Sequence, residues 1–339
     1  MTKANDDATF PGAYAREIIT LAGRLGVTPE PLLEGLGMSL AELEKPQTRL
    51  GLEPLTRLVL RTIELTGEPG LAFYMGLHMR LSWHGFLGFA AMTAKNVREA
   101  LSLAERFSRT RTTAISLRVA QEGEIGSLTL EENVDLGALR PHLVIALFTG
   151  IGEIAYAVTG QRLRGTVDLS FPEPAHFERF EHLVPGTVRF ERPASRILFE
   201  SAFFDVPFVT ADPVAMQLAR EQCERELATL GEGVRLLDQV RALLREQAEG
   251  VPTIDEVAKR LHVSTRTLKR KLADHGTTYT DVVDAYLRHR ALLLIDDPRL
   301  TIDEIAGRLG YSDAANFTRA FRRWTGSTPG AFRGRGDRS

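Results

Sequence analysis

The sequence contains a single cysteine, Cys223, among its 339 residues, so it can form neither an internal disulfide nor a cysteine metal cluster. This usage fits a protein of a reducing cytosol. The N-terminal residues are acidic and lack the apolar core of a signal peptide. The most apolar long stretch, Leu143–Val158, is interrupted by Glu153 and is too short to cross a bilayer. We therefore expect a cytoplasmic protein without a membrane segment or an export signal.

Sequence motifs for catalysis are also missing. There is no glycine-rich phosphate loop, no Gly-x-Ser-x-Gly elbow and no zinc-protease motif. The histidines of residues 1–230 lie without the spacing of metal ligands: His78, His84, His142, His176 and His182. We therefore expect no catalytic residue, no metal and no cofactor, with an enzyme as the rival interpretation of residues 1–230.

Charge is divided unevenly along the chain. Residues 251–339 contain 16 basic and 11 acidic side chains, whereas the first 250 residues contain 26 and 33. The basic end could therefore face an anionic polymer while the rest of the chain does not. The length predicts two or three domains at about 100–200 residues each, and the 43% hydrophobic content is enough for a buried core.

Residue periodicity predicts an α+β domain over residues 1–206. Apolar residues recur at helical spacing through residues 11–110, and alternating, β-branched sequence follows near Thr112. Further helices are expected over Leu139–Val158 and Ala175–His182. The expected strands form a small mixed or antiparallel sheet: Thr113–Ala120, Ile125–Glu131, Arg164–Phe171, Gly186–Phe190 and Arg196–Phe199.

A helical linker is expected over residues 207–250, with helices at Val214–Leu230 and Val234–Gln247. On the first of these helices, Cys223 has apolar neighbours and is expected to be a packing residue rather than a sensor. Gly250-Val251-Pro252 marks the boundary to an all-α domain over residues 251–333. Residues 334–339 are rich in glycine and arginine and are expected to form a disordered tail.

A twelve-residue segment occurs twice near the C-terminal end. Residues 253–264 and 301–312 are identical at eight of twelve positions, at an offset of 48. Each copy begins with a threonine followed three residues later by a glutamate, the pattern of a capping box that starts a helix. Each copy continues through a tight turn into a second helix, which is the helix-turn-helix pattern. The repeat therefore predicts two such units, at 253–273 and 301–325.

The second helix of each unit is rich in cations. Leu268 and Leu272 lie four residues apart and are expected to face inward, as are the aromatic residues of 313–325. The basic residues are left for the outer faces and flanks: Arg266, Lys269, Arg270, Lys271, Arg319, Arg322 and Arg323. Such a helix can enter a major groove and neutralise phosphates on either side. Because such basic residues occur on the second helix of both units, we expect them to bind DNA rather than only to face solvent.

Gly310–Pro329, with Phe332 and Arg333, resembles the signature of AraC/XylS-type bacterial regulators, and the resemblance covers residues 251–333. It implies an all-helical DNA-binding domain in which a central helix, here Tyr279–Ile295, joins the two helix-turn-helix units. It also implies base reading by Arg266, Lys269 and Arg270 in the first unit and by Ala314, Ala315 and Arg319 in the second. The full set of expected DNA-binding residues is Ser264, Thr265, Arg266, Thr267, Lys269, Arg270, Ala314, Ala315, Asn316, Arg319, Arg322 and Arg323.

The second unit departs from a base-reading pattern at two positions. Ala314 and Ala315 cannot form side-chain hydrogen bonds and could touch only thymine methyl groups. We therefore expect the first unit to supply most of the direct base readout. The second unit is expected mainly to position the protein on the DNA backbone.

The N-terminal part also resembles a known domain. Gly85–Ala94, Val97–Leu101 and Thr210–Pro213 are similar to the effector domain of the ornithine-utilisation-regulator type, often called arabinose-binding-like. That label does not predict arabinose as the ligand. Nearby, Trp83, His84, Phe86 and Phe89 either line an apolar effector pocket with a polar handle or pack as core residues.

These patterns predict a sequence-specific DNA-binding transcription regulator, an activator controlled by an effector in its N-terminal domain. The expected partners are double-stranded DNA, a small-molecule effector, a second copy of the chain and, by the resemblance, RNA polymerase. Two alternatives stay open. The N-terminal domain could serve dimerisation alone, which a filled pocket or a ligand-induced thermal shift would argue against. It could also be enzyme-like, which a convergent cleft of titratable side chains would favour.

Overall fold

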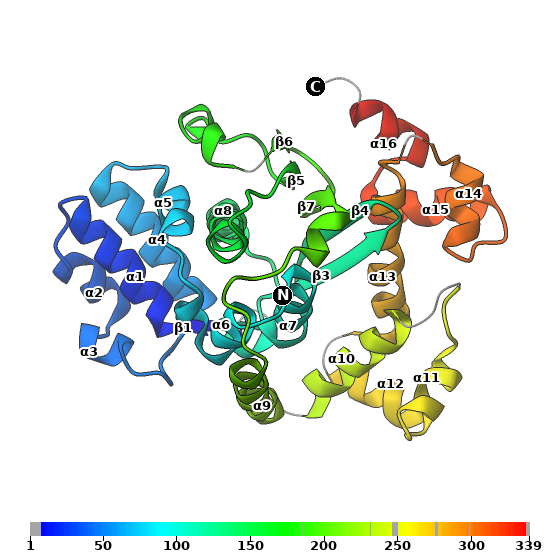
Figure 1. Cartoon of the computed structure of the whole chain (residues 1–339), viewed down its shortest axis with the longest axis horizontal. Coiled ribbons are helices and arrows are strands. Elements are labelled where there is room, and N and C mark those ends of the chain that lie inside the picture. The colour runs from blue at the N-terminus through cyan, green and yellow to red at the C-terminus, as the bar shows by residue number, and fades with distance from the viewer. Residues whose placement is uncertain are drawn as a thin grey trace. The chain divides into compact units, whose positions relative to one another are not determined.

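The computed structural model describes residues 8–184, 186–230, 232–245, 250–274, 277–297 and 299–336. It divides the chain into two compact units, residues 1–226 and residues 227–339 (Figure 1). The first unit combines helices with a small sheet, and the second contains helices joined by turns, with no strand among its described residues. This confirms the predicted fold class.

Helices dominate the first hundred residues of the N-terminal unit. A short antiparallel ladder between β1 (Thr9–Pro11) and β2 (Arg49–Gly51) ties the start of the described chain to this region. Helix α4, for example, buries one stripe that contains Leu55, Leu58 and Val59. The helices of this region are α1 (Gly12–Arg24), α2 (Glu30–Leu36), α3 (Leu40–Leu43), α4 (Leu52–Thr66), α5 (Leu71–Leu77), the 3-10 helix η1 (Leu81–His84), α6 (Gly85–Met92) and α7 (Val97–Arg111).

The sheet of this unit is mixed. Its strands are β3 (Ile115–Glu122), β4 (Ile125–Glu132), β5 (Gly165–Asp168), β6 (Thr187–Arg189) and β7 (Ser195–Glu200), in the order β3-β4-β7-β5-β6. All neighbouring pairs are antiparallel except β5 and β6. The predicted hairpin joins β3 to β4 through Gly123, which has a φ of 59°. The short helix predicted over Ala175–His182 is present as 3-10 turns at Phe177–Arg179 and Glu181–Leu183.

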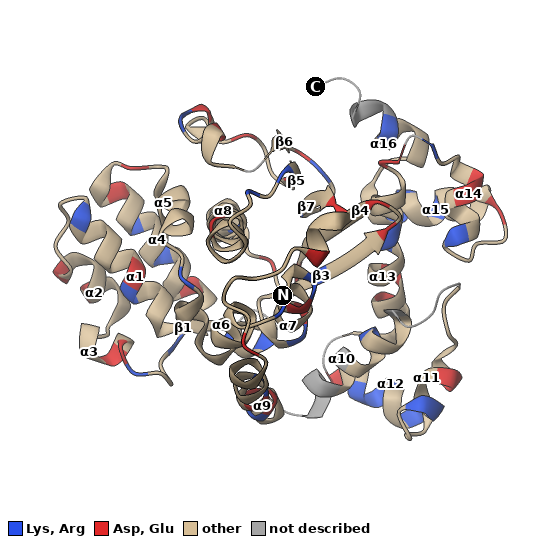
Figure 2. Ribbon diagram, in the orientation of Figure 1, with Lys and Arg blue, Asp and Glu red and all other residues tan. Residues whose placement is uncertain are grey.

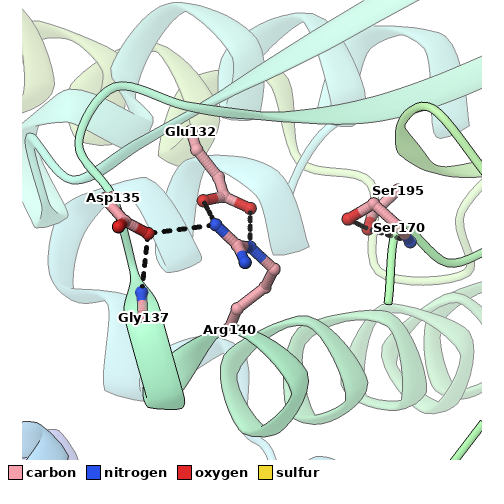
Figure 3. Close-up of polar contacts among 6 residues, drawn as sticks. All are labelled: Glu132, Asp135, Gly137, Arg140, Ser170 and Ser195. Carbon is pink, nitrogen blue, oxygen red and sulfur yellow. Dashed lines mark hydrogen bonds and ion pairs between the residues drawn. The ribbon is translucent and has the colours of Figure 1, made fainter. Parts of the chain in front are cut away.

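Helix α8 (Arg140–Thr159) is anchored to the sheet by its first residue. The Arg140 guanidinium donates to both carboxylate oxygens of Glu132, at the end of β4, at 2.7 and 3.0 Å, and to Asp135 at 3.1 Å (Figure 3). Nearby, the hydroxyls of Ser170 and Ser195 lie 2.9 Å apart and join the segment after β5 to the start of β7. The bonds of Arg140 fix the start of α8 against the end of β4.

The sequence argument on the length of α8 was wrong. With the preceding 3-10 turn, the helix runs over Gly137–Thr159, 23 residues, and is long and apolar enough to cross a membrane. The structure gives a different reason for this composition. One side packs closely on α5, where a Cβ on Gly76 would lie 2.6 Å from the Cβ of Thr149. Another side lines a cavity described below, so apolar residues are needed on both sides.

The segment predicted as a linker is divided between the two units. In α9 (Pro213–Thr229), Cys223 is buried and Glu224 pairs with Arg106 of α7 at 2.7 Å. In α10 (Glu232–Arg245), Val240 and Leu244 join the core of the C-terminal unit instead. The sequence therefore predicted both helices but not the unit to which each belongs, because helical spacing reveals a buried face without its partner.

The C-terminal unit contains two helix-turn-helix pairs joined by a central helix, as predicted. Its further helices are α11 (Ile254–Arg260), α12 (Thr265–Asp274), α13 (Tyr279–Leu294), α14 (Ile302–Arg308), α15 (Ala314–Thr325) and α16 (Pro329–Gly336). In Figure 1 the pairs α11–α12 and α14–α15 lie toward opposite ends of α13. Helix α16 continues through residues 334–336, which were predicted as tail, and residues 337–339 lie outside the described part.

The turn between α11 and α12 follows the Schellman pattern. The His262 N–H donates to the carbonyl of Lys259 at 3.2 Å, and the Val263 N–H donates to that of Ala258 at 3.0 Å. This pattern requires a left-handed residue after the end of the first helix, and His262 has a φ of 55°. A side chain in that conformation costs about 1–2 kcal/mol.

The turn between α14 and α15 repeats this pattern with a glycine. The Gly310 N–H donates to Gly307 at 3.0 Å, and the Tyr311 N–H donates to Ala306 at 2.9 Å. Gly310 has a φ of 83°, and a Cβ there would lie 2.9 Å from the Cα of Gly250. The positive φ and the close approach of the Gly250 backbone both require a glycine at position 310.

Substitution of the two turn residues should have opposite effects. His262→Gly is expected to raise the free energy of unfolding of the C-terminal unit by up to about 1 kcal/mol, since relief of strain exceeds the extra unfolded-state entropy of glycine. Gly310→Ala is expected to lower it by more than about 1 kcal/mol. Urea unfolding followed by the fluorescence of Trp324, with Trp83→Phe in the background, reports on this unit alone. Shifts in the same direction would contradict the assigned turns.

Candidate DNA-binding surface and effector cavity

Helix α12 is held in place by its cap and its apolar side. The Ser264 hydroxyl accepts the N–H of Thr267 at 3.1 Å, which caps the helix. The Thr265 hydroxyl donates to Asp255 of α11 at 2.5 Å, which joins the first turns of the two helices. Leu268 and Leu272 are buried beneath the helix in the core shared with α10, α11 and α13. This arrangement turns the opposite side of α12 outward.

The outward side of α12 carries three available cations. Arg266, Lys269 and Arg270 are exposed, and within the described ranges the structure gives none of them an ion-pair partner. Lys271 is half-buried and takes part in an interaction within the chain. Figure 2 shows the basic residues on α12. Unpaired cations on an exposed helix can bind phosphates or guanine edges.

Helix α15 presents a different surface, because its polar residues are largely engaged with one another. Asp313 caps the helix by accepting the N–H of Asn316 at 2.7 Å. The Asn316 amide donates to Asp313 at 2.7 Å and to Ser312 at 3.0 Å, while Arg319 donates to the Asn316 carbonyl oxygen at 2.5 Å. Asn316 is therefore a part of the cap, and it orients Arg319.

The remaining expected contacts of α15 differ in availability. Arg322 is exposed, whereas Arg323 forms an ion pair with Asp284 of α13, at 2.7 and 2.8 Å. Arg323 is also exposed, so its predicted role in DNA binding stays a prediction; its pairing with a residue 39 positions away was not predictable from the helix itself. Ala315 is exposed and Ala314 is half-buried at the start of the helix.

Aromatic contacts fix the rotation of α15 about its axis. Phe317 and Phe321 are fully buried, with ring centroids 5.6 Å apart. Phe317 packs against Tyr311 of the turn at 5.8 Å, and Phe321 packs edge-on against Phe332 of α16 at 5.5 Å. These contacts leave Arg319 and Arg322 on the exposed side.

The N-terminal unit contains a partly open cavity of about 280 Å³. Its wall is almost wholly apolar and comes from helices α1 and α4 to α8 and from β3 and β4. No aspartate or glutamate among the described residues lines it. The polar lining residues are Tyr14, His84, Ser108, Arg111, Thr112 and His142. The cavity lies near the lower end of the range of small-molecule sites.

One end of the cavity carries a polar cluster. The Tyr14 hydroxyl and Nδ1 of His84 lie 2.8 Å apart. Burial, reinforced by the charge of Arg111, lowers the pKa of His84 to about 4. Burial also raises the pKa of Tyr14, against the opposing influence of Arg111. At neutral pH the imidazole is therefore neutral and the phenol protonated, which leaves Arg111 as the one charged group among the described lining residues.

The four residues predicted for an effector pocket do not share one cavity. Trp83 and His84 line the apolar cavity, whereas Phe86 and Phe89 do not and are 44% and 48% exposed. Both phenylalanines border an adjoining, more polar cleft, which Trp83 also lines. Their closeness in sequence was misleading, because Trp83 and His84 belong to η1, whereas Phe86 and Phe89 lie on α6. The cavity is lined by other residues of α6, Leu87, Gly88 and Ala91.

Sequence reasoning missed Tyr14 and Arg111. Arg111 is the last residue of α7, where a basic residue is typical of a solvated helix end. A signal was present nonetheless: Ala100, Ala104, Ser108 and Arg111 recur at helical spacing, and all four line the cavity. A helix face of small residues that ends in a basic residue favours a cavity beside the helix over a closely packed core.

Comparison with known families identifies both units. A family model described as the arabinose-binding domain of AraC transcription regulator matches residues 26–208, more than half of the chain. The chain belongs to the AraC family of transcription regulators. A helix-turn-helix domain model matches residues 257–335. This regulator therefore binds DNA through its helix-turn-helix domain, and the matched families and relatives are regulators rather than enzymes.

Several relatives match nearly the whole chain in sequence. The ornithine utilization regulator of Pseudomonas aeruginosa is 32% identical over 324 residues, covering 95% of this chain and 96% of the relative. Uncharacterized helix-turn-helix regulators of Mycobacterium bovis and Mycobacterium tuberculosis are each 26% identical, over 97% of this chain and 98% of theirs. The crystal structure of the regulator CdpR from Pseudomonas aeruginosa is 26% identical, with a TM-score of 0.43, over 90% of this chain and 96% of that one.

Salt dependence of DNA binding should separate free from paired cations. Arg266→Ala is expected to weaken binding to a random-sequence duplex and to reduce the slope of log K against log salt by about 1, as loss of one phosphate contact does. Arg323→Ala should change the slope less, because Asp284 holds that charge. Asp284→Asn, the matched control, should strengthen binding by releasing Arg323. Fluorescence anisotropy at several salt concentrations measures this. Equal slope changes for Arg266→Ala and Arg323→Ala would contradict the assignment.

The stability of the N-terminal unit should fall in mild acid. The unfolded chain protonates His84 near its ordinary pKa of 6.5, but the folded unit resists protonation until about pH 4. The stability contributed by the neutral ring is therefore full above pH 6.5 and is lost as the pH falls toward 4. At pH 5 the loss is at most about 2 kcal/mol. Urea unfolding followed by Trp83 fluorescence, with Trp324→Phe, should show a shallower pH dependence in His84→Gln; an unchanged dependence would count against the buried neutral ring.

Proposed function

We propose that this regulator is a transcription activator controlled by a small molecule that binds in the cavity of its N-terminal unit. The observation that carries the proposal is the cavity itself, about 280 Å³ of space behind an apolar wall. A concave, mostly apolar space with a few polar groups is typical of a small-molecule site.

The wall favours an apolar ligand. A relative is named for ornithine utilization, and free ornithine carries two ammonium groups. Such groups need carboxylates or other acceptors when buried, and none of the described lining residues is acidic. We therefore propose that this regulator responds to a molecule more apolar than an amino acid.

In the DNA complex, α12 and α15 enter successive major-groove segments about 34 Å apart on one face of the duplex. Arg266, Lys269 and Arg270 of α12 read bases, and their exposure without an ion-pair partner among the described residues supports this role. Arg319 and Arg322 of α15 mainly bind the backbone. The capping side chains Ser264, Thr265, Thr267 and Asn316 hold the helix starts at the DNA, while Ala314 and Ala315 face thymine methyl groups.

Effector binding biases the orientation or dimerisation of the DNA-binding units, because the ligand binds one of two states more tightly. The active form is a homodimer that contacts RNA polymerase. The regulator works in the cytoplasm, where its DNA partner is found. These assignments rest on membership of the family rather than on a contact within this chain.

Filling the cavity tests effector control. Ala104→Phe places a ring in the cavity, and Ala41→Phe makes the same change at an exposed position of α3. In cells that carry a reporter behind the promoter found by genomic footprinting, Ala104→Phe is expected to change promoter activity by about tenfold, within the usual range of allosteric coupling. Affinity for the DNA site in vitro should stay within about twofold, and Ala41→Phe should match the native chain. Promoter activity unaffected by Ala104→Phe would instead support an N-terminal unit that serves dimerisation alone.

A further inference from the structure

Resting on the proposed function, a more specific inference concerns the class of the ligand. We infer that the cavity takes an amphiphilic anion, with an unbranched apolar tail inside the cavity and one carboxylate-like head bound by Arg111. Three features lead to this assignment. The first is the pair of unsatisfied donors on α7. The second is the absence of acidic residues from the described part of the cavity wall. The third is a basic cleft that adjoins the cavity.

Two buried donors on one side of α7 lack partners. Nε of Arg111 and the hydroxyl of Ser108 are buried without a hydrogen bond within the described part of the chain. They lie one helical turn apart, and both residues line the cavity. Buried donors in a native fold normally find an acceptor. A carboxylate offers acceptor oxygens to both residues, and a guanidinium can bind it with two parallel hydrogen bonds.

The surroundings of Arg111 increase the local positive charge. The Arg49 guanidinium donates to the backbone carbonyls of Thr110 and Arg111, at 3.3 and 2.6 Å. Burial and the charge of Arg111 both lower the pKa of Arg49, which reflects two cations held close together. No described carboxylate lies within ion-pair distance of Arg111, while His84 and Tyr14 beside it are neutral at neutral pH. Glu226, whose charge opposes the lowering of the pKa of Arg49, is nearby but forms no ion pair with Arg111 among the described residues. An anionic head would supply a direct partner for Arg111.

A second hollow adjoins the first at this point. A surface cleft of about 630 Å³ shares Met75, Trp83 and Arg111 with the apolar cavity, so these side chains form the partition between the two spaces. Basic residues outnumber acidic ones on the cleft wall. The basic residues are Arg16, Arg24, Lys45, Arg80 and Arg111, and the acidic ones are Glu17, Glu44 and Glu226. An anion is therefore favoured on the cleft side and an alkyl chain on the cavity side.

A chain of medium length suits a cavity of about 280 Å³, which lies near the lower end of the range of small-molecule sites. Decanoate, with an apolar tail and one carboxylate, is the probe. Decan-1-ol has a similar tail without the charge, and decyltrimethylammonium reverses the charge of the head.

Isothermal titration calorimetry on the full chain tests the assignment. Decanoate is expected to bind at least about tenfold more tightly than decan-1-ol, and decyltrimethylammonium should bind most weakly. Arg111→Gln should weaken decanoate binding by about tenfold or more while leaving decan-1-ol binding unchanged. Arg111→Lys, which keeps the charge, should recover part of the affinity. The matched control is Arg106→Gln, an exposed arginine of the same helix that does not line the cavity.

Ser108→Ala provides a second variant, because it removes a neighbouring donor without changing charge or adding bulk. It should weaken decanoate binding more than decan-1-ol binding, whether or not Arg111→Gln folds. Equal binding of decanoate and decan-1-ol to the native chain would overturn the assigned head while leaving an apolar effector, and so the proposed function, intact. Failure of all three probes to bind would overturn the assigned ligand class, whereas the Ala104→Phe reporter experiment judges effector control independently.

Discussion

The presentation of each DNA-contacting helix depends on one tight turn. A left-handed residue, His262 or Gly310, allows one helix to end and the capped start of the next to follow within a few residues. The second helix can then bury Leu268 or Phe317 against the core, which directs its basic residues outward. The hydrogen bonds that close the turns therefore serve both the stability of the unit and the placement of its charges. The same sequence repeat encodes both, because its caps, turns and buried positions are only a few residues apart.

Locality also explains how much of the C-terminal unit could be predicted. Capping boxes, helix starts and the inward leucines and aromatics follow from neighbouring residues, and the structure places them as expected. Longer-range pairing could not be predicted in this way. Arg323 belongs to the cationic side of α15 by its position in the sequence, yet Asp284 of the central helix holds it. Helix α10 similarly had a predictable apolar side whose partner became visible only in the folded unit.

The N-terminal unit shows where sequence patterns stop being informative. A hairpin is local and was predicted, but a cavity is formed by faces of helices that are distant in sequence. Helical periodicity cannot distinguish a side that packs, such as Phe148 of α8, from a side that lines an open space, such as Ile151. For the same reason, the aromatic cluster near Trp83 combined lining residues with surface residues. Arg111 was overlooked because a cation at a helix end is usually solvated, and only the fold shows it beside an apolar cavity.

Hydroxyl-radical footprinting of the regulator on its own DNA site tests most directly whether α12 and α15 act together from one face of a duplex. Two protected segments per chain, centred about one helical turn or 10 base pairs apart, are predicted, with protection that weakens steeply as salt is raised. A single protected segment per chain, or protection that does not respond to salt, would contradict a DNA-binding surface built from two cationic helices.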